Sequence, residues 1–141
     1  MSFGQAAAQR GIRPPADAPC PCGGVAFGEC CGPVLDGTRA ATAAALMRSR
    51  YTAFAIGDAV HLEATWHPST RPSDIDLDDG VRWQHLEILA TDAGAEGDRR
   101  GTVEFRAHFR DADGAAGSLH ERSRFIHRRD RWWYLDGDVD R

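Results

Sequence analysis

The chain has no lysine, no long apolar run and no cysteine outside one short segment. All seventeen basic residues are arginine, and we interpret the missing lysine as an effect of genome composition, not of function. No apolar stretch approaches the ~18–20 residues that a transmembrane helix needs. Residues 1–19 lack the apolar core of a secretory signal, so we expect a cytoplasmic protein without a membrane segment.

Internal repeats, a phosphate-binding glycine loop and a serine nucleophile elbow are missing as well. The 141 residues suit one domain with a small appendage, and a hydrophobic fraction of 42% is ordinary for a globular protein. The net charge of −4 argues against a general nucleic-acid-binding surface, although it leaves room for a local basic patch. Composition therefore indicates a globular domain, and its function has to be sought in particular residues.

Four cysteines gathered within twelve residues are the most specific feature that is present: Cys20, Cys22, Cys30 and Cys31. Their thiolates can close a tetrahedral shell around one Zn²⁺ with no open position, so we expect a structural zinc ion. Two disulfides are one alternative, which fits a chain of this length poorly. A redox dithiol is the other, although such pairs more often have a C-x-x-C spacing.

The first half of the domain is predicted to be helical. Residues 40–56 have apolar side chains at steps of three and four, which indicates a helix with one buried stripe. Thr38 lies close to the expected N-cap, and Gly57 is a suitable C-terminal stop. A shorter helix over residues 58–66 follows, with Asp58 as its cap.

The second half has the alternation of antiparallel strands, which we predict over residues 81–90, 102–110, 119–128 and 131–135. Trp132 and Trp133 must point to opposite faces, so one belongs to the core and the other to a rim. The acidic residues 136–140 are expected to be a solvated end. Helices followed by strands favour an α+β fold, with the helices on one face of the sheet. The chain then divides into a disordered leader, a cysteine knuckle and an α+β domain, at residues 1–19, 20–35 and 36–141.

Several separate blocks resemble the YchJ family of small bacterial proteins: CPCGG with CCG, ALMRSRYTAF, TWHP, VEFRAHF, LHERSRF and WWYLDGD. The resemblance covers residues 20–138. The cysteine segment is similar to the zinc-binding SEC-C motif, but the loop of residues 23–29 is one residue shorter than usual. The resemblance implies a cone-shaped, curved antiparallel sheet of the nuclear-transport-factor-2-like fold, preceded by a small zinc knuckle. It also implies a protein partner at the knuckle, because the same motif serves in protein contacts elsewhere.

Folds of this kind often hold a pocket in the mouth of the cone, which implies a small-molecule ligand there. One hypothesis is an enzyme of the isomerase or hydrolase type, with an acid–base pair of Glu104 or Glu121 with His108. The alternative is a structural network in which arginines hold both carboxylates. The residues proposed to line the pocket are Arg50, Tyr51, Trp66, Trp83, Glu104, His108, Glu121, Ser123 and Trp133.

Two functions therefore follow from the sequence, and the metal signal is the more specific of the two. The first is a zinc-stabilised binding or adaptor protein, and the second is a small-molecule enzyme that uses the cone pocket. No two histidines have a ligand spacing that predicts a second metal site. The sequence leaves the ligand, the partner and the oligomeric state open.

Overall fold

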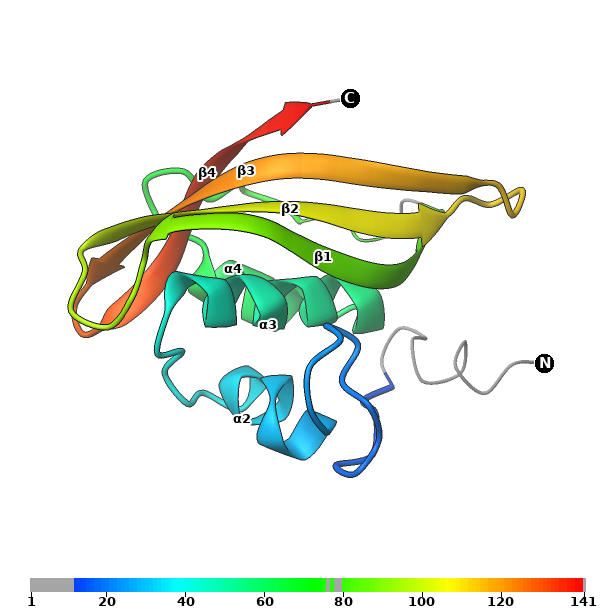
Figure 1. Ribbon diagram of the computed structural model, residues 1–141, viewed down its shortest axis with the longest axis horizontal. Helices are drawn as coiled ribbons and strands as arrows, with labels where there is room; N and C mark the ends of the chain where they lie inside the picture. The colour runs from blue at the N-terminus through cyan, green and yellow to red at the C-terminus, as the bar shows by residue number, and fades with distance from the viewer. Residues whose placement is uncertain (1–11, 76, 78–79, 141) are drawn as a thin grey trace.

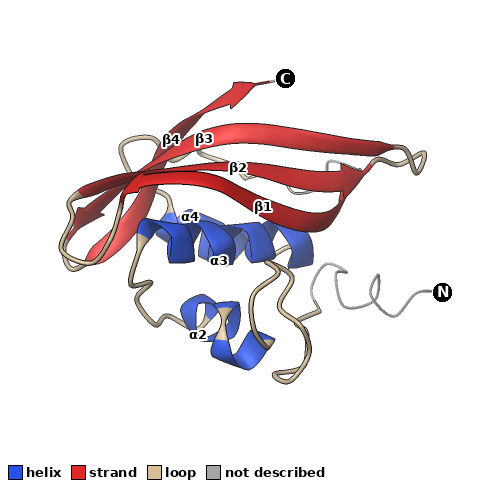
Figure 2. Ribbon diagram, viewed as in Figure 1, coloured by secondary structure: helices blue, strands red, loops and turns tan. Residues whose placement is uncertain are grey.

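The computed structural model describes residues 12–75, 77 and 80–140. Four antiparallel strands in the order β1-β2-β3-β4 curve over two helices, α3 and α4, and the short helix α2 lies on the far side of α3 (Figures 1 and 2). The helices are α2 (Cys31–Leu35), α3 (Ala43–Ile56) and α4 (Ala59–Thr65), preceded by a 3-10 turn over Phe27–Glu29. The strands are β1 (Arg82–Ala93), β2 (Arg100–Arg110), β3 (Ala116–Arg128) and β4 (Arg131–Asp140).

This arrangement confirms the α+β prediction, with the helices on one face of the sheet. Alternation along β2 buries Val103, Phe105 and Ala107 against the helices. Their neighbours across the β2–β3 pairing include Ser123, opposite Val103, and Glu121, opposite Phe105, which brings both polar side chains to the inner face. Among the described residues, no helix is long and apolar enough to cross a bilayer.

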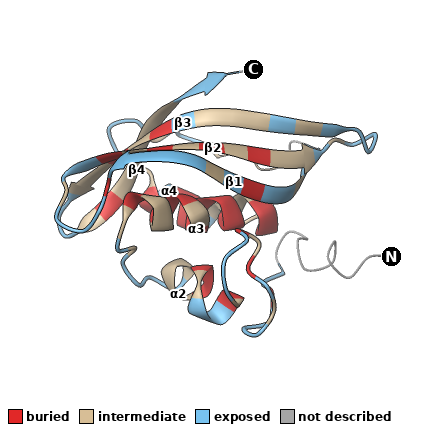
Figure 3. Cartoon of the chain, in the orientation of Figure 1, coloured by how far each residue is buried: buried red, intermediate tan, exposed pale blue. Residues whose placement is uncertain are grey.

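Helix α3 is buried almost all round, which differs from the single buried stripe predicted for it. Ten of its fourteen residues are buried, and Figure 3 shows this burial along most of the helix. The sheet covers one side, and the cysteine segment with α2 covers the other. The apolar spacing predicted only the contact with the sheet. The polar residue Thr52 faces the cysteine segment, and Ser49 faces α4, where its Oγ lies 2.9 Å from the Nε2 of His61.

Both ends of α3 are fixed by local hydrogen bonds. Gly57 ends the helix at a φ of 81°, and its N–H donates to the carbonyl of Ala53. At the other end, Thr42 is the N-cap, because its Oγ1 accepts a hydrogen bond from the N–H of Ala45 at 3.0 Å. Thr38, which we expected at or close to the N-cap, is exposed and lies before the helix begins.

The acidic end of the chain is largely exposed, as expected, but it belongs to the sheet. β4 continues to Asp140, and Arg124 on β3 donates to Asp136 and Asp138 on β4. The predicted strand over residues 131–135 ended too early, because strand propensity in the acidic segment is low, whereas cross-strand charge pairs of opposite sign stabilise it.

Residues 12–19, predicted to be disordered, pack against the cysteine segment. Arg13 donates to Asp36 at 2.8 Å and lies over the ring of Phe27, and the carbonyl of Ala18 accepts from the N–H of Phe27. The rest of the predicted leader, residues 1–11, lies outside the described residues.

The N-cap assignment gives a direct stability prediction. We expect Thr42→Ala to lower the free energy of unfolding by about 1 kcal/mol, because the N–H of Ala45 loses its acceptor. Thr38→Ala is the matched control and should change it by far less. Urea denaturation followed by circular dichroism measures both, and an equal loss for the two variants would contradict the assignment.

Candidate metal centre and cavity

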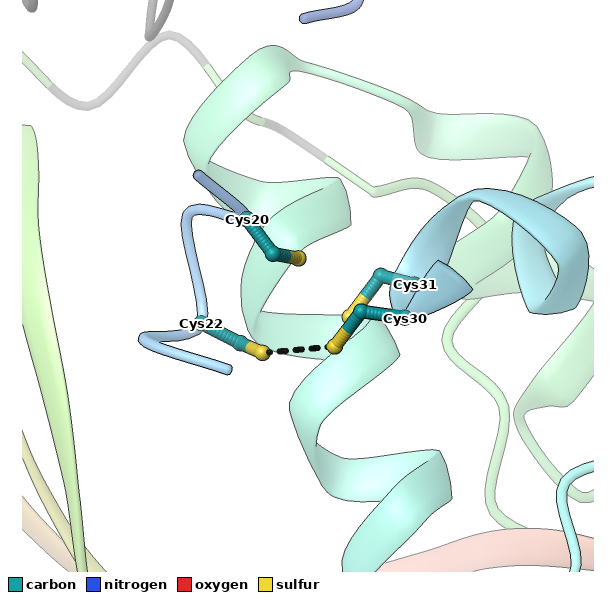
Figure 4. Close-up of side chains that lie close together, drawn as sticks. All are labelled: Cys20, Cys22, Cys30 and Cys31. Atoms are coloured by element: carbon teal, nitrogen blue, oxygen red, sulfur yellow. Dashed lines mark hydrogen bonds between the residues drawn. The ribbon is translucent and has the colours of Figure 1, made fainter. Parts of the chain in front are cut away.

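The four cysteines converge from two segments. Cys20 and Cys22 lie in the loop that precedes the 3-10 turn, and Cys30 and Cys31 lie at the start of α2 (Figure 4). All four sulfur atoms lie within 4.8 Å of one another, and the Sγ atoms of Cys22 and Cys30 are 3.4 Å apart. A tetrahedral zinc ion with Zn–S bonds of ~2.3 Å needs sulfur atoms about 3.8 Å apart. The residues therefore fit one zinc ion with small side-chain adjustments.

The loop closes tightly despite being one residue short. The N–H of Gly23 donates to the carbonyl of Cys20, and the N–H of Cys20 donates to that of Val25. Gly23 has a φ of 87°, which glycine adopts without strain. A Cβ on Gly24 would lie 2.7 Å from the Sγ of Cys30, so only glycine fits beside the sulfur cluster.

The close spacing of the thiols shifts the pKa values of three of them. Hydrogen bonds from Cys22 and Cys31 lower the pKa of Cys20 to about 2. Burial, followed by the interaction with Cys22, raises the pKa of Cys30 to about 12. The hydrogen bonds that Cys31 makes to Cys20 and Cys22 raise its pKa far above the usual range. Four thiols at this spacing cannot all ionise without a cation, and a divalent ion bound among them would supply the missing positive charge.

The sulfur cluster is continuous with the hydrophobic core of the domain. Cys20, Cys22 and Cys31 are almost fully buried in the same cluster as Leu46 and Phe105. Two residues of α3 contact the cysteine loop directly: Arg48 donates to the carbonyl of Cys22 at 3.1 Å, and the Oγ1 of Thr52 lies 3.8 Å from the Sγ of Cys20. The candidate metal centre is thus built onto α3.

A cavity of about 190 Å³ lies on the opposite side of α3, beneath the sheet. Six of the residues proposed from the sequence line it: Arg50, Tyr51, Trp66, Trp83, Glu121 and Ser123. The remaining lining was not assigned to the site from the sequence and consists of Met47, Phe54, Phe105, Ala107, Leu119 and Tyr134. Alternation places Tyr134 on the same face as Trp132, two residues earlier, but it does not show that this face is the inner one.

Three of the proposed residues lie outside this cavity. Glu104 and His108 alternate with the buried residues of β2 and therefore point to the outer face, where Glu104 pairs with His120 and His108 with Glu87. Trp132 takes the core position, which leaves Trp133 on the other face, with its Nε1 donating to the carbonyl of Arg128. The acid–base pair of Glu104 or Glu121 with His108 does not form.

Arg50 is a buried cation at one wall of the cavity. Its side chain is only 3% exposed, and its Nη1 donates to the carbonyl of Leu62 and to the Oγ1 of Thr65. The guanidinium lies 4.3 Å from the ring centroid of Tyr134 and 5.0 Å from that of Trp66. Burial lowers the pKa of Arg50 to about 10, so it remains charged at neutral pH.

Glu121 is the carboxylate of the cavity, and no arginine holds it. Its Oε2 accepts hydrogen bonds from the Oγ of Ser123 at 2.6 Å and from the hydroxyl of Tyr134 at 3.2 Å. Within the described part of the chain, Glu121 has no salt bridge, and its Oε1 has no hydrogen-bond partner. The arginine network that the sequence offered as an alternative is therefore not formed either.

A second group of ionisable residues occurs on the outer face of the sheet. The side chains of His85, Glu87 and His108 bring their ligand atoms within 4.8 Å of one another, a proximity that the sequence did not reveal because it spans two strands. The two imidazole rings stack nearly parallel, with centroids 4.1 Å apart. The nitrogen lone pairs of an imidazole lie in the plane of its ring. Two stacked rings therefore direct their lone pairs along parallel planes and not toward one shared ion. We interpret this group as a hydrogen bond between His108 and Glu87, with the ring of His85 stacked on that of His108.

The close approach of Gly24 to the cluster predicts a metal-affinity defect. Gly24→Ala should raise the zinc dissociation constant by about 10- to 100-fold, because its methyl group displaces the Cys30 thiol. The control is Val25→Ala, since Val25 is 62% exposed at the adjacent position. Competition against a chromophoric chelator measures both constants. Equal affinities for Gly24→Ala and the wild type would show that the loop does not hold the metal in this geometry.

The chain matches known proteins over most of its length. The family model for the YchJ middle NTF2-like domain matches residues 42–137. A UPF0225 protein of Streptomyces coelicolor is 54% identical over 122 residues, which cover 85% of this chain and 94% of that protein. A UPF0225 protein of Chromobacterium violaceum is 48% identical over 129 residues, with 88% and 95% covered.

A solved structure agrees with the fold. The solution structure of a SEC-C motif-containing protein from Rhodopseudomonas palustris is 38% identical and has a TM-score of 0.77. The match covers 88% of this chain and 100% of that one. From the family model and these relatives, the chain belongs to the YchJ (UPF0225) family, with an NTF2-like middle domain after its cysteine motif.

Proposed function

We propose that the protein is a binding module in which a structural zinc ion fastens the cysteine knuckle to α3. The supporting observation is that four thiols lie within 4.8 Å of one another. They pack against α3, the helix that also lines the cavity. Four thiolates leave no coordination position for water or substrate, so zinc bound here would stabilise the fold and take no part in a reaction. The ligands would be Cys20, Cys22, Cys30 and Cys31.

The state of the thiols supports a cytoplasmic location. All four cysteines are free, and a four-thiolate site needs reduced cysteines, which the cytoplasm maintains. A protein partner at the knuckle stays a prediction. The SEC-C motif in the Rhodopseudomonas palustris protein and the exposed side chain of Val25, beside the sulfur cluster, are compatible with it.

Metal content tests the main proposal. Protein purified without chelator should contain about one zinc ion per chain by elemental analysis, with thiols that react only after a chelator is added. Iron in place of zinc would support the four-thiolate site but contradict the assignment of zinc, since tetrahedral sulfur sites suit both metals. Metal-free protein with disulfide-bonded or freely reactive thiols would contradict the proposal.

A second candidate function is the binding of a small molecule in the cavity. Two charged groups in an otherwise largely aromatic cavity favour it. They are the carboxylate of Glu121, which has no salt bridge among the described residues, and the buried guanidinium of Arg50. Arg50 offers donors to an acceptor or anionic group, and the aromatic rings offer apolar contact. If the bound molecule reacts, Glu121 is the candidate base, because its Oε1 is the oxygen without a partner in the described residues.

The charge balance of the cavity gives a test with benzoate as the probe. Benzoate should quench the fluorescence of Trp66 and Trp83, both of which line the cavity. Glu121→Gln removes a like charge and should raise the benzoate affinity by roughly fivefold, which corresponds to about 1 kcal/mol. Glu104→Gln, on the outer face, is the control and should leave the affinity unchanged. No quenching by benzoate, or the same gain from both variants, would contradict this candidate.

A further inference from the structure

Two turns that are distant in sequence meet at one end of the sheet. The turn between β1 and β2 and the turn between β3 and β4 lie at the same end in Figure 1, and the N–H of His127 donates to the carbonyl of Arg99 at 2.8 Å. Beside them is a hollow of about 1130 Å³. Its basic lining residues are Arg99, Arg100, Arg124, Arg128, Arg129, His67 and His127. We refer to this surface as the arginine hollow.

The positive charge of the arginine hollow is largely uncompensated. Arg124 is neutralised by Asp136 and Asp138. The other four arginines are exposed, and none has a carboxylate partner within 4.0 Å among residues 12–75, 77 and 80–140. Asp92 is the one acidic residue of the lining, and Arg124 with its two carboxylates contributes 1 − 2 = −1. With the four exposed arginines, the sum is 4 − 1 − 1 = +2, in a chain whose net charge is −4. The charge is therefore local, which the overall composition hides.

The turn that carries Arg128 and Arg129 has an unusual backbone. Arg129 and Asp130 both adopt left-handed conformations, with φ of 54° and 64°. Such a two-residue hairpin turn favours Asn-Gly, because glycine and asparagine tolerate positive φ. An arginine in this position is strained, and local strain is concentrated at functional sites.

An aromatic side chain extends the arginine hollow. A smaller depression of about 320 Å³ is lined by His67, Pro68, Arg128, Arg129 and Trp133, so it shares three residues with the hollow. Trp133 is half-buried, with the guanidinium of Arg131 4.2 Å from its ring centroid. Unpaired cations beside an indole ring are the combination that binds phosphates and stacks bases in single strands.

We propose that the arginine hollow binds single-stranded nucleic acid, with Arg99, Arg100, Arg128 and Arg129 on the phosphates and Trp133 against a base. Two joined depressions suit a chain of several nucleotides better than a single phosphate. The hollow lies apart from the sulfur cluster and from the cavity, so this inference is independent of the proposed zinc function.

The test is fluorescence anisotropy with labelled oligouridylate and oligothymidylate of about ten nucleotides, at about 50 mM salt. Arg128→Gln/Arg129→Gln should weaken binding at least about tenfold and reduce the slope of log K against log salt by about 1.4, since two phosphate contacts are lost. Arg82→Gln/Arg110→Gln is the control, because these two exposed arginines are cross-strand neighbours in β1 and β2 outside the hollow. Trp133→Leu should weaken binding at least about fivefold.

Binding of either oligonucleotide that is lost in the hollow variant and kept in the control supports the proposal, and the preferred strand shows whether the ligand is RNA or DNA. No binding at low salt, or an equal loss in both double variants, would overturn it. Binding to phosphatidylglycerol vesicles without binding to oligonucleotides would assign the hollow to a membrane surface and overturn it as well. Oligonucleotide binding that a metal chelator abolishes, and that the Arg128→Gln/Arg129→Gln variant retains, would place the binding site at the knuckle and overturn the proposal.

Discussion

Helix α3 is packed from two sides, and the other features of the molecule depend on this double packing. The sheet covers the side that carries Met47 and Tyr51, and the cysteine segment covers the side that carries Arg48 and Thr52. A helix with polar residues on its second side would be poorly covered by an apolar layer. The cysteine segment supplies both kinds of contact. The carbonyl of Cys22 accepts from Arg48, the Sγ of Cys20 lies 3.8 Å from the Oγ1 of Thr52, and the buried cysteines add apolar surface, so the knuckle belongs to the core.

This packing connects two sites through one rigid element. Arg48 reaches the cysteine loop, and Arg50, two residues later, reaches the cavity on the other side of the helix. If the cluster holds a metal and the cavity a ligand, as proposed, removal of the metal should affect the cavity through the position of α3. The arginine hollow is built on different elements, the turns at the end of the sheet, and does not share this dependence.

The sequence predicted those features that depend on local pattern and left out those that depend on tertiary contact. Cysteine spacing identified the sulfur cluster, and alternation identified the inner face of β2. Because Trp132 and Trp133 are neighbours in a strand, the sequence showed that their side chains point to opposite faces. It did not show which of the two is buried. The partners of Arg50 come from α4, and the arginine hollow joins turns about thirty residues apart, so neither could be read from spacing.

Hydrogen–deuterium exchange with and without bound metal tests the central claim, that the knuckle is a structural part of the α3 core. Removal of the metal by chelation should speed the exchange of amides in residues 20–35 and, together with them, of amides in α3. The strands β2 and β3 should remain protected. Faster exchange confined to residues 20–35, with α3 unchanged, would show that the knuckle is an independent appendage and would contradict the account.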